Sequence, residues 1–144
     1  MFITDSKIIE EWTTAFIADA IDRSIITAIR GTRPTRAEAK QWALPITEAS
    51  SKTSTRMETI EIIDRALARD IYSAYVTVEE EVWNEVRTHF GVTGHPEEVV
   101  KALGEDHGEI FDVARDGLED KAKAQAAEIT ARRIAQQTAI LKEK

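Results

Sequence analysis

The sequence predicts an all-α protein, an irregular bundle of about six or seven helices that ends in a long C-terminal helix. Three observations predict this fold class. Apolar residues recur at spacings of three and four along most of the 144 residues, without the alternation of a half-buried strand. Threonine followed three residues later by glutamate, which is typical of helix starts, occurs at Thr35, Thr55 and Thr77. Glycine or proline stands where most of these runs stop.

The first expected helix runs from about Asp5 to Arg30 and stops at Gly31. Two apolar stripes run along different sides of it, one formed by Ile9, Trp12, Phe16 and Ala20 and the other by Ile21, Ile25 and Ile29. A helix that is apolar on two sides is expected at the centre of a bundle or at an interface between subunits.

Five shorter helices are expected next, over about residues 35–44, 55–75, 77–90, 96–103 and 105–116. Pro45 ends the first of them, because proline cannot continue a helix. The small polar residues 47–54 predict a loop. Pro96 and the two glutamates after it favour a helix start, where the helix dipole is positive.

The last expected helix runs from about Leu118 to Lys142 and is rich in alanine. A heptad-like seam of alternating threes and fours follows it, formed by Ala124, Ala127, Ala131, Ile134, Thr138 and Leu141. This seam can dock onto the body of its own chain or pair with another chain. We therefore expect one domain, with a helical body over residues 1–116 and a C-terminal helix over residues 117–144 that can extend as an arm.

Composition excludes several classes of protein. The chain has no cysteine, so disulfides, thiolate catalysis and cysteine-ligated zinc are excluded. It shows no signal-peptide core and no window near the ~18 apolar residues that span a bilayer, so no membrane partner is expected. The expected location is the cytoplasm, or a virion assembled there.

The charge of the chain is acidic and unevenly distributed. A formal net charge of −7 disfavours broad binding to nucleic acid, because phosphates repel it. Nine basic and five acidic residues lie between Arg23 and Arg69, whereas three basic and thirteen acidic residues lie between Glu79 and Asp120. This asymmetry favours either head-to-tail contact between copies or attraction between the two halves of one copy.

One group of carboxylates is a candidate metal site. Glu105, Glu109, Asp112 and Asp116 share one face of their expected helix, and carboxylates of this kind can hold Mg²⁺. The pair Glu109 and Asp112 resembles half of the motif of the all-α nucleotide pyrophosphohydrolases. That resemblance implies a magnesium-dependent hydrolase, but the facing half, Glu-Glu-x-x-Glu, is not matched by the upstream residues Glu79, Glu80, Glu81 and Glu85.

A second group is cationic. Arg30, Arg33 and Arg36 surround a loop that leads into an expected helix start, an arrangement suited to an anion or to an acidic partner. Trp42, on the short helix before Pro45, is a candidate interface anchor.

These observations favour a non-enzymatic assembly or adaptor protein without a cofactor, whose partner is a protein and in the first instance a second copy of itself. The expected interface consists of Trp42, Ala124, Ala127, Ala131, Ile134 and Leu141. Small cysteine-free helical proteins are common among phage and mobile-element structural or accessory components, which favours that setting. Three alternatives remain: an acidic module that inhibits a basic or nucleic-acid-binding partner, nucleic-acid contact through the Arg30–Arg36 loop, and the magnesium-dependent hydrolase.

Overall fold

The computed structural model describes residues 2–30, 57–104 and 107–142, which are helical apart from short connections and contain no strand. The helices are α1 (Ser6–Arg30), α4 (Arg65–Phe90), α5 (Pro96–Leu103), α6 (His107–Arg115) and α7 (Leu118–Lys142), and residues 57–63 are also helical. The predicted all-α class and the long C-terminal helix, of 25 residues, are confirmed. The helix expected over residues 35–44 lies outside the described ranges. None of the described helices combines the length and apolarity needed to cross a membrane.

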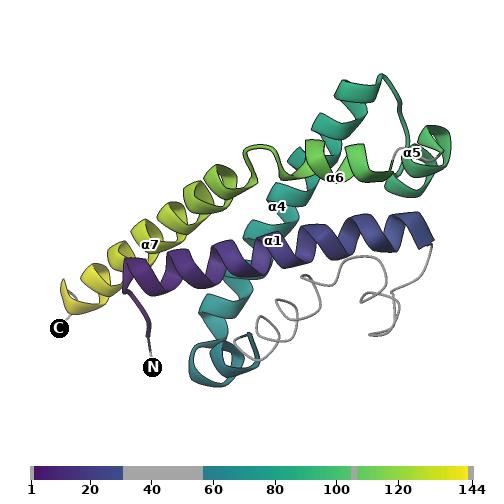
Figure 1. Ribbon diagram of the computed structural model, residues 1–144. Coiled ribbons are helices and arrows are strands. Elements are labelled where there is room, and N and C mark those ends of the chain that lie inside the picture. Colours follow the sequence, from purple (N-terminus) through teal and green to yellow (C-terminus); the bar gives the residue numbers. More distant parts are fainter. Residues whose placement is uncertain (1, 31–56, 105–106, 143–144) are drawn as a thin grey trace.

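Helix α1 lies at the centre of the described helices and contacts α4, α5, α6 and α7 (Figure 1). Its isoleucines form the middle of the core, since Ile9, Ile17, Ile21, Ile25 and Ile26 are at most 1% exposed. The two apolar sides predicted for this helix are therefore covered largely by the chain's own helices. Of the two placements expected for such a helix, the centre of the bundle is the one observed.

The predicted boundary between residues 75 and 77 is wrong, because α4 continues without interruption from Arg65 to Phe90. Thr77 does not cap a helix start; its hydroxyl donates to the carbonyl of Ser73, 3.2 Å away and one turn earlier. Threonine can satisfy itself in this way inside a helix, so a Thr-x-x-Glu pattern alone does not prove a start. A continuous buried stripe holds the two parts together: Leu67, Ile71, Ala74, Val78, Val82 and Val86.

The helical path breaks instead at Asp64, inside the helix predicted over residues 55–75. Asp64 has a non-helical backbone, with φ −149° and ψ 84°, and is the N-cap of α4. Its carboxylate accepts a hydrogen bond from the backbone N–H of Leu67 at 3.1 Å, which satisfies a donor of the first turn. At the other end, Gly91 closes α4 in the left-handed conformation with φ 67°, as its sequence position predicts.

The short helices follow the prediction closely. Helix α5 begins at Pro96 and ends before Gly104, with Glu97 and Glu98 in its first turn. His95 occupies the N-cap position of α5 without donating or accepting a side-chain capping bond. Helix α6 ends at Arg115, one residue before the end of the helix expected over residues 105–116, and residues 105–106 lie outside the described ranges.

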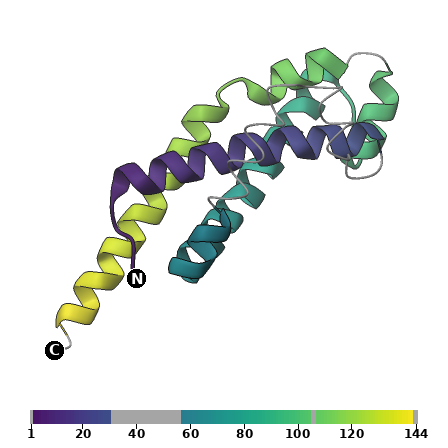
Figure 2. The ribbon, with the colours of Figure 1, turned by 60° about the horizontal axis from the view of Figure 1, so that its bottom comes forward.

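Helix α7 runs antiparallel to α1 and docks on the body through one stripe (Figure 1). The buried side chains of this stripe are Leu118, Ala122, Ala126, Ile129 and Arg133. Beyond Arg133, every described side chain of α7 is exposed. Figures 1 and 2 both show this end of α7 projecting past the beginning of α1. The helix therefore has a docked part and a projecting part.

Candidate functional site

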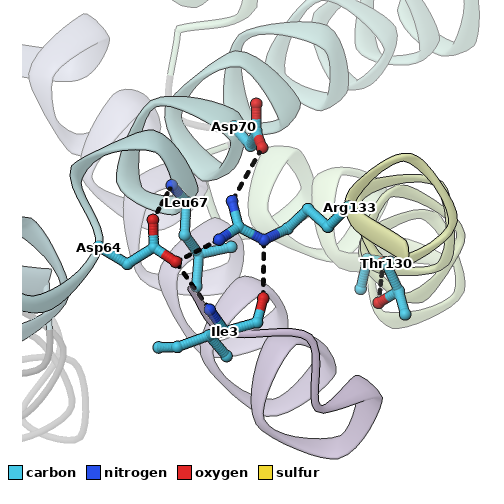
Figure 3. A network of polar contacts seen from close by, with 7 residues as sticks. Ile3, Asp64, Leu67, Asp70, Thr130 and Arg133 are labelled. Atoms are coloured by element: carbon cyan, nitrogen blue, oxygen red, sulfur yellow. Dashed lines mark hydrogen bonds and ion pairs between the residues drawn. The ribbon is translucent and has the colours of Figure 1, made fainter. Parts of the chain in front are cut away.

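A buried ion pair between Asp64 and Arg133 joins three segments of the described chain (Figure 3). Arg133 of α7 is 0% exposed and Asp64 is 5% exposed. The Arg133 guanidinium donates from Nη2 to the Asp64 carboxylate and from Nε to the carbonyl of Ile3 at 2.7 Å, while Nη1 lies 3.5 Å from Asp70. The Asp64 carboxylate also accepts from the N–H of Ile3 at 2.9 Å.

This junction is internally satisfied. The carboxylate of Asp64 receives the Arg133 guanidinium and two backbone N–H groups, and Phe2 covers the guanidinium with its ring centroid 4.1 Å from Cζ. A buried ion pair with this many hydrogen bonds leaves neither charge to attract a ligand. The junction therefore fixes the fold by joining the N-terminal residues, the start of α4 and α7.

A groove beside α1 differs from the junction because it is a cavity lined by side chains of several elements. Its cavity has a volume of about 950 Å³ and is lined mainly by apolar atoms. Its walls come from the middle and end of α1, from residues 57–61, from one side of α4 and from the start of α5. The described lining side chains with charge or aromatic character are Phe16, Asp19, Arg23, Glu58, Glu61, Tyr72, Tyr75, Glu79, His95, Glu97 and Glu98.

Three aromatic rings form one wall of the groove. Phe16 of α1 meets Tyr72 and Tyr75 of α4 edge to face, with ring centroids 5.0 Å and 5.9 Å apart. This arrangement is favoured because the positive edge of one ring faces the negative face of another. Rings this close leave no room for a ligand between them, so they act as a continuous wall.

The two tyrosine hydroxyls orient carboxylates of the groove. Tyr72 donates to Glu61 at 3.2 Å, and Tyr75 donates to Glu79. Burial, followed by these hydrogen bonds to carboxylates, raises the pKa of Tyr72 and strongly raises the pKa of Tyr75. Both hydroxyls therefore stay protonated near neutral pH, and each carboxylate keeps further lone pairs that can accept from a ligand.

The groove carries an excess of negative charge. Six of its described lining residues are acidic, whereas Arg23 is the single lysine or arginine among them. Arg23 lies 3.2 Å from the carboxylate of Asp19, one turn away on α1. This arrangement contrasts with the Asp64–Arg133 junction, because most of the carboxylates here face no cation among the described residues that line the groove.

The predicted seam lies on the exposed side of α7, and Ala131 also borders a shallow groove between α7 and α4. Ala124, Ala127, Ala131 and Ile134 are all exposed, and Ile134 is 49% exposed. We call these four residues the outer face of α7. The docking stripe of the same helix uses different residues, so the outer face is left uncovered. The side chain of Leu141, the last seam residue, lies outside the described part of the chain.

The predicted acidic face appears on α6 and just beyond it. Glu109, Asp112 and Asp116 are exposed, and Glu109 lies 3.6 Å from His89 of α4. Among residues 2–30, 57–104 and 107–142, no three His, Asp or Glu side chains are grouped closely enough to hold a metal ion. Of the upstream glutamates, Glu79 accepts from Tyr75 and Glu85 pairs with Lys121 at 2.9 Å. Glu105 lies outside the described residues.

The predicted cationic loop falls almost wholly outside the described residues. Arg33, Arg36 and Trp42 lie outside the described ranges, and Arg30 is described only as the last residue of α1.

Sequence reasoning missed the groove, although a signal was present. Tyr72, Tyr75 and Glu79 recur at helical spacing beside the apolar stripe of α4. Dividing this helix at residue 76 separated the tyrosines from Glu79 and hid their common face. The approach of residues 57–61 and the start of α5 to that face depends on tertiary structure.

Comparison with known protein families, with curated proteins and with solved structures finds no match for this chain.

Proposed function

We propose that this chain is a non-enzymatic assembly or adaptor protein that self-associates through the outer face of α7. The observation that carries the proposal is that α7 is apolar on two opposite sides while the body covers one of them. Its docking stripe ends in the buried Arg133, whereas Ala124, Ala127, Ala131 and Ile134 face outward. Small side chains of this kind let a second helix approach closely.

Charge along α7 favours an antiparallel arrangement of two copies. The first half carries three acidic residues against two lysines, namely Glu119, Asp120 and Glu128 against Lys121 and Lys123, whereas the second half carries the exposed Arg132 and Lys142 and no acidic residue among those described. A pairing centred on Ala131 places Asp120 of one copy opposite Lys142 of the second copy, because each lies eleven residues from the centre. Opposite charges at the ends of a helix pair favour this direction over the parallel one.

The support from α1 is weaker than its two apolar stripes predict. Both stripes are occupied largely by helices of the same chain, so α1 does not require a second copy. Other large apolar side chains are exposed, with Ile62 at 86% and Ile140 at 54%. Ile140 lies on the projecting end of α7, seven residues after Arg133 and so on the side of the docking stripe, and a second copy packed on the outer face leaves it exposed.

The test is the mass of the protein in solution across a wide concentration range, measured by analytical ultracentrifugation. We expect a monomer–dimer equilibrium that Ala131→Arg weakens by at least about tenfold, because two arginines then face each other at the centre of the pair. Ala102→Arg is the matched control, since Ala102 is an exposed alanine on α5. A chain that stays monomeric at several hundred micromolar, or a dimer insensitive to Ala131→Arg, contradicts the proposal.

A further inference from the structure

The groove beside α1 has the dimensions of a short peptide segment. The lining residues of α1 run from Phe16 to Ala28. Twelve residues of α-helix rise about 18 Å, so the groove is long enough for about five or six residues of extended chain. Its volume of about 950 Å³ far exceeds what a single ammonium group or metal ion fills.

The chemistry of the lining selects a basic segment with an apolar centre. The wall formed by Phe16, Tyr72 and Tyr75 can cover aliphatic side chains, and aromatic faces also attract arginine and lysine. Carboxylates stand at both ends, with Glu58 and Glu61 on one side and Glu97 and Glu98 on the other. Nucleic acid is disfavoured by the same carboxylates, which would repel its phosphates.

We propose that this groove binds a short segment of another protein in which lysine or arginine residues flank an apolar centre. The carboxylates of Glu61 and Glu79 are already oriented by tyrosine hydroxyls, so they can accept from incoming cations with little rearrangement. This inference does not depend on self-association, since the groove and the outer face of α7 share no residue.

Peptide titration tests the inference directly. The probe is a fluorescein-labelled six-residue peptide, Lys-Arg-Leu-Leu-Arg-Lys, and its anisotropy is followed as the full chain is added. We expect saturable one-to-one binding that Glu61→Gln with Glu79→Gln weakens at least tenfold. Glutamine keeps an oxygen that can accept from the tyrosines, so this double variant preserves the wall while removing two charges. Circular dichroism checks that it is folded.

The matched control removes two charges elsewhere. Asp112→Asn with Glu128→Gln alters exposed carboxylates outside the groove and is expected to change affinity less than twofold. Equal weakening by both double variants would reduce the effect to general attraction by an acidic protein and would overturn the inference. A peptide in which serine replaces both leucines is expected to bind at least fivefold more weakly; equal binding would remove the apolar centre from the proposal.

The competing occupant is the chain's own basic segment over residues 31–56. If the natural chain does not bind the probe but a variant with Arg33, Arg36 and Lys40 changed to glutamine does, the groove serves that segment and the inference fails. Oligomeric state is measured on the same samples, so a failure of the groove and a failure of self-association are separated.

Discussion

The Asp64–Arg133 junction and the groove beside α1 both contain carboxylates, but those of the junction are paired and buried whereas most of those in the groove are not. At the junction, one buried carboxylate receives a buried guanidinium and two backbone donors. In the groove, five carboxylates besides the Asp19–Arg23 ion pair line a cavity that contains no other described arginine or lysine. Compensated charge holds a fold together, whereas uncompensated charge beside an apolar wall is available to a partner. Pairing and burial therefore distinguish the two regions better than the number of charges does.

The largest effect is expected at the junction. Arg133→Ala should lower the free energy of unfolding by about 3–5 kcal/mol, because it leaves the buried Asp64 carboxylate without its cation. Urea denaturation measures the change, and Arg132→Ala is the matched control. Arg132 is exposed and adjacent, so its loss should cost less than about 0.5 kcal/mol. Similar costs for the two variants would mean that the junction contributes no more than a surface charge.

A smaller effect of opposite sign is expected in the groove. Glu61→Gln with Glu79→Gln should leave the free energy of unfolding unchanged or raise it by up to about 0.5 kcal/mol, because repulsion falls while the tyrosines keep an acceptor. Glu85→Gln, which breaks the ion pair of Glu85 with Lys121, should instead lower it by about 0.2–1 kcal/mol. Thermal and urea unfolding both report these changes. A marked destabilisation by the groove variant would show that its carboxylates are structural like Asp64.

The smallest effect is expected at Asp22, a partly buried carboxylate that is paired less completely than Asp64. Burial raises the pKa of Asp22, while the hydrogen bond and charge of Arg115, 3.1 Å away, partly offset the rise. A raised pKa means that the folded state holds this proton more tightly than the unfolded state. The contribution of Asp22 to stability is therefore greatest below its ordinary pKa of 3.8 and is lost as the pH rises through the raised value.

Asp22→Asn removes this titration. The stability of Asp22→Asn relative to the natural chain should therefore increase as the pH is raised from about 3.5 to 6, since asparagine carries no charge to bury. Urea denaturation at a series of pH values measures the difference. A difference that is constant across this range would show that Arg115 compensates the buried charge fully.

Much of the fold follows from local sequence. Helix α5 begins at proline and ends before glycine, α7 begins directly after glycine, and the structure places these ends, and the start of α1, within a residue of the predicted positions. The interior of α4 was predicted incorrectly because Thr77 and Glu80 match a capping pattern, and the pattern does not distinguish a cap from a threonine that bonds back to its own helix. Tertiary packing of the buried Leu67–Val86 stripe keeps α4 continuous through Thr77.

The sites were less predictable than the helices for a physical reason. Asp64 is one acidic residue in an amphipathic run, and nothing nearby in sequence indicates that Arg133 will lie against it. The groove likewise gathers side chains from residues 16 to 98. Charge asymmetry singled out the acidic stretch Glu79–Asp120, but the groove also takes Asp19, Glu58 and Glu61 from outside it. Which carboxylates find cations depends on packing that periodicity does not encode.

The junction also has a consequence for how the chain folds during synthesis. It joins the carbonyl of Ile3 to Arg133, across 130 residues, and Asp64 lies between them in sequence. The ribosome delivers residue 133 long after α1 has emerged, and domains complete only when their last contacts are available. Until then the isoleucines of α1 lack the helix that covers one of their sides. A nascent chain stalled before residue 133 should consequently need a chaperone, whereas a chain whose residue 133 has left the ribosome can close on its own.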